Sequence, residues 1–123
     1  MGAKTMTSTQ ETPPAVPFRV GVLSFSDGRP RVHETLRDAV KRNETRLAEA
    51  IGKDPLLMAI PASEIVHSIL QAKSTASEMR AAGIEAAVFN VPVFAFPNYS
   101  LMAARLLDMP VILKARRIMG ATP

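Results

Sequence analysis

Short apolar runs alternate with longer amphipathic segments along most of this chain of 123 residues. The apolar runs are bounded by turn residues, as buried strands are, and cover residues 18–25, 56–60, 85–90 and 109–113. The segments between them repeat apolar residues at helical spacing, over residues 30–52, 63–83 and 98–107. This alternation predicts an α/β domain with a parallel sheet and right-handed crossovers.

The predicted helices carry recognisable start and stop signals. Pro30 suits the first position of the first helix, and Gly52 stands where the residue after its end is expected. Ser63 is the predicted N-cap of the second helix, with Glu64 in its first turn and Gly83 at its end.

The predicted sheet is flavodoxin-like, with about four strands in the order 2-1-3-4 and flanking helices. We expect Leu23, Val88 and Ile112 to be buried on this sheet. The order places the first and third strands side by side, so the loops that follow them, residues 26–30 and 90–98, flank one crevice. Ligands of open parallel sheets bind at such a crevice.

Four residues of these loops are the candidate substrate-binding residues. Arg29 can bind a carboxylate or phosphate, or donate to sugar hydroxyls, and Asp27 can accept from hydroxyls or position Arg29. Phe94 offers an aromatic face to the apolar face of a sugar ring, and Asn90 can both donate and accept. The alternative is an ordinary strand-to-helix turn, in which Asp27 caps the helix and Arg29 lies in solvent.

The sequence predicts no catalytic residue, cofactor site or metal site within this chain. Glu64 and His67 share one face of the second predicted helix, but a single pair without further ligands is expected to lie on the surface. His33 belongs to the first predicted helix, and we expect neither histidine to lie near the two loops. The chain has no Cys and no Gly-rich phosphate-binding motif.

Composition narrows the partners and the compartment. The net charge is +4, but Lys114, Arg116 and Arg117 supply three of the 15 basic residues, which leaves 12 against 11 acidic ones. A nearly neutral body argues against nucleic acid as a partner. No apolar run has the ~20 residues of a membrane span. Without a secretory signal, the cysteine-free sequence suits a cytoplasmic protein. We expect a disordered arm over residues 1–17, a domain over 18–113 and an irregular basic tail over 114–123.

The two loops carry a resemblance to a known family. A strand that ends in Asp27-Gly28-Arg29, followed by an amphipathic helix that begins at residues 31–36, resembles the N-terminal domain of L-fucose isomerase and its relatives. The broader group includes L-arabinose isomerase. Residues 89–96 lie about where the family has a Pro-x-aromatic loop, and the resemblance covers residues 18–113.

The resemblance implies an enzyme of carbohydrate metabolism that interconverts aldoses and ketoses. The family uses a divalent metal, typically manganese, whose ligands lie in later domains. Its N-terminal domain helps close the sugar site, often that of a neighbouring subunit, which implies a sugar, the catalytic domains and a homo-oligomer as partners. By resemblance, Arg29 reaches toward the sugar and Phe94 replaces a stacking aromatic residue, expected to be Trp in L-fucose isomerases. Because Phe is a smaller platform without an N–H donor, the sugar is left open.

The chain is therefore expected to be a truncated isomerase that is inactive alone. Moving hydrogen between adjacent sugar carbons requires a metal that polarises both oxygens, or a positioned acid–base pair. Two alternatives remain at this point. The first is a stand-alone small-ligand or sugar-binding module of flavodoxin-like fold. The second is a remnant that folds poorly, which a non-cooperative melt would reveal.

Overall fold

A computed structural model of the chain describes residues 16–26, 28–91 and 97–114. The elements alternate as the sequence predicts: β2 (Phe18–Ser24), α1 (Pro30–Gly52), β3 (Leu57–Pro61), α2 (Ile69–Ala81), β4 (Ala86–Asn90), α3 (Pro97–Leu107) and β5 (Val111–Lys114). No helix in the described part of the chain combines the length and the apolarity needed to cross a membrane.

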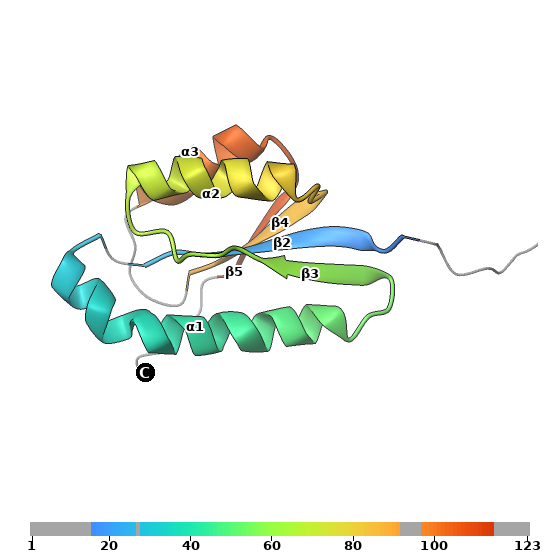
Figure 1. Cartoon of the computed structure of the whole chain (residues 1–123), viewed down its shortest axis with the longest axis horizontal. Helices are drawn as coiled ribbons and strands as arrows, with labels where there is room; N and C mark the ends of the chain where they lie inside the picture. Colours follow the sequence, from blue (N-terminus) through green and yellow to red (C-terminus); the bar gives the residue numbers. More distant parts are fainter. Residues whose placement is uncertain (1–15, 27, 92–96, 115–123) are drawn as a thin grey trace, which may run out of the picture.

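The four strands form one parallel sheet in the order β3-β2-β4-β5. This order confirms the flavodoxin-like prediction and places β2 beside β4, with Ser24 opposite Asn90 at their carboxyl ends. Pairing continues past β2, because the Phe25 N–H donates to the Asn90 carbonyl at 3.0 Å. Helix α1 covers one face of the sheet, and α2 and α3 cover the other (Figure 1).

The main core lies between the sheet and the α2–α3 pair. Alternate residues of the central strands point to this side, where Leu23, Phe25 and Phe89 are almost fully buried. The rings of Phe25 and Phe89 meet at 4.8 Å with a 50° tilt. At Gly21 a Cβ would lie 2.7 Å from Ile84 Cδ1, so glycine allows this close approach.

The second helix begins later than predicted. Helix α2 starts at Ile69, and the Ser68 hydroxyl accepts its capping bond from the Gln71 N–H at 3.1 Å. The predicted cap, Ser63, instead donates its N–H and hydroxyl to the Glu78 carboxylate. The reason is that residues 62–66 stay beside β2: the Ala62 N–H donates to the Val22 carbonyl at 2.9 Å and the Val66 N–H to the Ser24 carbonyl at 2.8 Å, with bends at residues 63 and 64 between them.

Three smaller expectations also change. Leu23 and Val88 are buried as predicted, but Ile112 is 66% exposed. It lies on the edge strand β5, whereas α1 packs on β2 and β3. Gly52 is the last residue of α1 rather than the residue beyond it. Lys114, expected in the basic tail, belongs to β5. The rest of that tail, and the predicted arm up to residue 15, lie outside the described residues.

Candidate functional site

The candidate crevice begins where β2 and β4 end side by side. Arg29 is the exposed N-cap residue of α1, with an extended backbone at φ −81° and ψ 122°. Its carbonyl accepts the first helical hydrogen bond, from the His33 N–H at 2.9 Å. Pro30 follows at the start of the helix, as predicted. Asp27 and Phe94, two more of the four residues expected to bind the ligand, lie outside the described residues.

A buried polar chain lies at the carboxyl ends of the two strands. The Asn90 amide donates to the Ser24 hydroxyl at 3.0 Å, and that hydroxyl donates to Glu44 Oε1 of α1 at 2.7 Å. The second carboxylate oxygen accepts from the Lys41 ammonium at 3.1 Å. Asn90, Ser24 and Glu44 are all nearly inaccessible to solvent. These hydrogen-bonded side chains therefore hold the starts of both loops against α1.

Two of these hydrogen-bonded residues, Ser24 and Glu44, were not predicted from the sequence. Glu44 lies on the apolar stripe of the first helix, four residues after Val40 and three before Leu47. An acid on such a stripe faces the core, so it requires a buried partner. That pattern was the available signal for Glu44 and hence for Ser24, whose hydroxyl on the facing strand is that partner.

The two histidines, expected to lie apart and away from the loops, stack on each other. The ring centroids of His33 and His67 are 3.8 Å apart, with an interplanar angle of 23°. His67 is not helical as predicted, because it belongs to the non-helical segment between β3 and α2. This segment runs along the end of β2 and brings His67 against the first turns of α1.

The surroundings of His33 disfavour its charged form. Burial, followed by the charges of His67 and Arg37, lowers the pKa of His33, while Glu34 acts in the opposite direction. The Nδ1 atom is buried and has no hydrogen-bond partner in the described part of the chain. The same holds for the hydroxyl of Ser26, at the start of the loop. Unpaired buried polar atoms are uncommon in folded proteins, so these two atoms are candidate contacts for a bound ligand.

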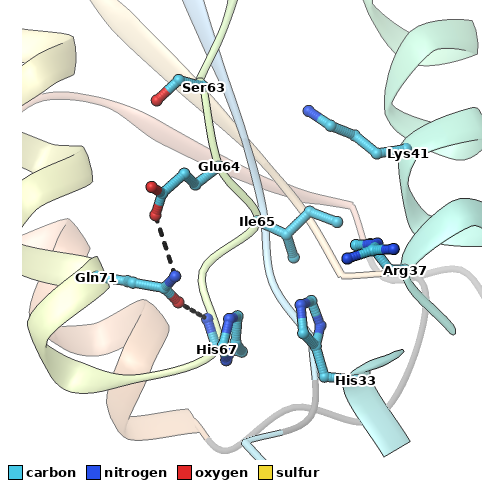
Figure 2. Close-up of a pocket in the computed structure, with 8 residues that line it drawn as sticks. All are labelled: His33, Arg37, Lys41, Ser63, Glu64, Ile65, His67 and Gln71. Carbon is cyan, nitrogen blue, oxygen red and sulfur yellow. Dashed lines mark hydrogen bonds between the residues drawn. The ribbon is translucent and has the colours of Figure 1, made fainter. Parts of the chain in front are cut away.

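A cavity of about 230 Å³ opens beside the stacked rings, between α1 and residues 63–67. Eight residues line it: His33, Arg37, Lys41, Ser63, Glu64, Ile65, His67 and Gln71. Figure 2 shows the basic side chains of α1 on one side and the Glu64 carboxylate turned toward Gln71 on the other. The Gln71 amide donates to Glu64 at 3.0 Å, and its oxygen accepts from the His67 N–H at 2.9 Å.

The described residues do not fit a divalent metal. Among residues 16–26, 28–91 and 97–114, no three His, Cys, Asp or Glu side chains gather in a way that could hold an ion. The stacked imidazoles present their faces, rather than converging nitrogens, to each other.

Comparison with known proteins identifies one protein family. No curated protein and no solved structure matches the chain significantly. The model of one protein family, described as the first N-terminal domain of L-fucose isomerase, matches residues 17–119 and thus most of the chain. Through this domain, the chain belongs to the L-fucose isomerase family.

Proposed function

We propose that this domain closes the sugar site of an aldose–ketose isomerase whose catalytic metal, expected to be manganese, is held by other domains. The observation that carries the proposal is the adjacency of β2 and β4 in a chain of this family. Their carboxyl ends bring the starts of the two candidate loops to one edge of the sheet, where open α/β folds bind ligands.

The proposed roles follow from position. Arg29 stands exposed at the start of α1, where a guanidinium can donate to sugar hydroxyls. Asp27 and Phe94 are proposed to accept from a hydroxyl and to stack on the sugar ring. Asn90 supports the site from below, since its amide already donates to buried Ser24. A rigid support of this kind reduces the entropy lost when a ligand is bound.

The domain is proposed to need its catalytic partner. Asp27 is the one carboxylate of the two loops, and general-base help from a lone group is worth about 10²–10⁴-fold. An enzyme typically needs about 10⁶-fold or more. We propose that a metal held by another domain supplies the remaining rate acceleration. That domain belongs to a partner of this chain or to a neighbouring subunit of a homo-oligomer.

A reconstitution assay tests this proposal. The purified chain is assayed with Mn²⁺ against fucose, arabinose and related aldoses, alone and with the metal-binding remainder of a homologous isomerase. We expect turnover only in the mixture, reduced by Arg29→Ala and unaffected by Arg46→Ala, an exposed arginine farther along α1.

Two results would contradict the proposal. Turnover by the chain alone, lost on Asp27→Ala, would make the domain an enzyme. Sugar binding by the isolated chain, with no gain in turnover for the mixture, would favour a stand-alone sugar-binding module.

A further inference from the structure

We propose that the cavity between α1 and residues 63–67 is a binding site for a compact oxyanion, with a phosphate group as the chemistry that fits it. Neither Arg29 nor Asn90 lines the cavity, which begins one helical turn along α1 from Arg29. It therefore stands whether or not the domain closes an isomerase site.

The charges around the cavity favour an anion. Arg37 and Lys41 project from α1 on one side, and the two imidazoles border the cavity below them in the view of Figure 2. Lys41 is balanced by Glu44 at 3.1 Å, but among the described residues Arg37 has one ion-pair contact, a distant one with Asp38 at 4.0 Å, and both of those side chains are largely exposed. Such an exposed contact is weak, so the Arg37 guanidinium keeps most of its capacity for a bidentate oxyanion.

The acidic residue of the cavity does not block this use. Glu64 is held on the far side by the Gln71 amide, and Figure 2 shows its carboxylate turned away from Arg37 and Lys41. Ser63, at the top of the same segment, gives its hydroxyl to Glu78. Arg37 is thus left facing open volume, while Lys41 keeps its pairing with Glu44.

The histidine pair supplies the second observation. His33 Nδ1 is buried without a hydrogen-bond partner among the described residues, and an oxyanion oxygen is an acceptor that a protonated Nδ1 can use. The groups facing this ring are His67, Arg37 and Glu34, and burial together with the first two lowers the pKa of His33. An anion beside the ring would offset the positive charge of Arg37 and stabilise the protonated form of His33.

The volume also fits. At about 230 Å³ the cavity is far larger than the ~10–15 Å³ that one ordered water requires, so it accepts a tetrahedral oxyanion together with its remaining hydration. Two sources share this chemistry: free inorganic phosphate, and the phosphate group of a phosphorylated sugar.

Imidazole NMR of the complete chain tests the site. Inorganic phosphate is titrated against chloride at constant ionic strength, and the ring nitrogens of His33 and His67 are followed with pH. We expect a saturable shift of both rings and a pKa of His33 that rises in phosphate. Arg37→Gln should weaken binding about tenfold or more, through loss of a charge-assisted contact. Arg42→Gln, an exposed arginine of α1 outside the cavity, should leave it within about twofold.

The outcomes separate clearly. Identical titration of His33 in phosphate and chloride would overturn the site, as would equal weakening by the two arginine variants, which would indicate screening of the surface as a whole. A second arm uses fructose 1-phosphate, with fructose as the neutral control. Tighter binding of the sugar phosphate than of phosphate supports a phosphorylated ligand, and equal binding supports the free ion.

Discussion

Replacing one buried hydroxyl should weaken the whole domain. Ser24→Ala removes the group that accepts from the Asn90 amide at 3.0 Å and donates to the Glu44 carboxylate at 2.7 Å. Both partners are buried and stay in place, so each loses a hydrogen bond without gaining water. We therefore expect a large cost for the loss of a single oxygen atom.

The magnitude follows from the two bonds. An unsatisfied buried polar group costs about 1–3 kcal/mol, with bonds to charged groups at the upper end. Glu44 keeps its second contact, to Lys41 at 3.1 Å, which limits its share. We expect Ser24→Ala to lower the free energy of unfolding by about 2–4 kcal/mol, a large fraction of the ~5–15 kcal/mol of a typical domain.

The chain provides a matched control two residues away. Ser26 is equally buried on the same side of the strand end, but its hydroxyl has no partner among the described residues. Ser26→Ala makes the same chemical change and should leave stability unchanged or raise it by up to about 1 kcal/mol. Urea unfolding followed by circular dichroism measures both variants, with an unchanged slope as the check that the unfolded state is comparable.

The comparison between the two serines decides the argument. Equal destabilisation of Ser24→Ala and Ser26→Ala would show that the loss of buried volume, rather than the hydrogen-bonded chain, carries the cost. A loss below about 0.5 kcal/mol for Ser24→Ala would refute the structural role given to the chain.

Three further predictions concern other parts of the fold. Folding lowers the pKa of His33 from its ordinary value of 6.5, so the unfolded chain binds this proton more readily. The free energy of unfolding should therefore be highest above pH 6.5 and fall as the pH drops from 6.5 toward the folded-state pKa. His33→Gln should flatten this part of a profile of stability against pH. Gly83→Ala should lower the free energy of unfolding by about 1–2 kcal/mol, since φ is +75° and a Cβ would lie 2.7 Å from the Arg19 guanidinium. Gly52→Ala is the control: a Cβ there has nothing within 4 Å and should raise the free energy of unfolding by about 0.4–1 kcal/mol. Thermal melts of both variants measure the difference. Arg80→Ala should cost about 0.5–1.5 kcal/mol and raise amide exchange at the end of α3, whose last carbonyls accept from this guanidinium at 3.1 and 3.3 Å.

The strand order could be predicted because hydrophobic periodicity and fold rules act along the chain. The start of α2 could not, since Ile65 and Ile69 are spaced as in a helix, while hydrogen bonds from Ala62 and Val66 to β2 hold the intervening residues beside that strand. The choice between a helix and a strand-like path depends on contacts with β2, which the local sequence does not show. The same non-helical segment places His67 against His33, so the error at the helix start and the missed imidazole stack have one cause.

The exposure of Ile112 has a different origin. Its apolar side chain predicts burial, but a strand at the edge of the sheet is buried only where a helix lies over it, and α1 packs on β2 and β3. For the candidate site, the sequence predicts the two loops, which stay a prediction, whereas the polar support formed by Ser24 and Glu44 depends on contacts between elements. The acid on the apolar stripe of α1 was the one feature that could have indicated it.

The position of β2 at the centre of the sheet also governs how this domain can be made. Its pairing with β4 joins Ser24 to Asn90, 66 positions apart, so the central strand has a partner on one side only until β4 has left the ribosome. A nascent chain that ends before β4 holds the open edge of β2 and the unfilled core beside Phe25, surfaces that favour association with other chains. Synthesis of β4 closes this edge, and Ala103 and Leu107 of α3, which follow it, complete the core beside Phe25.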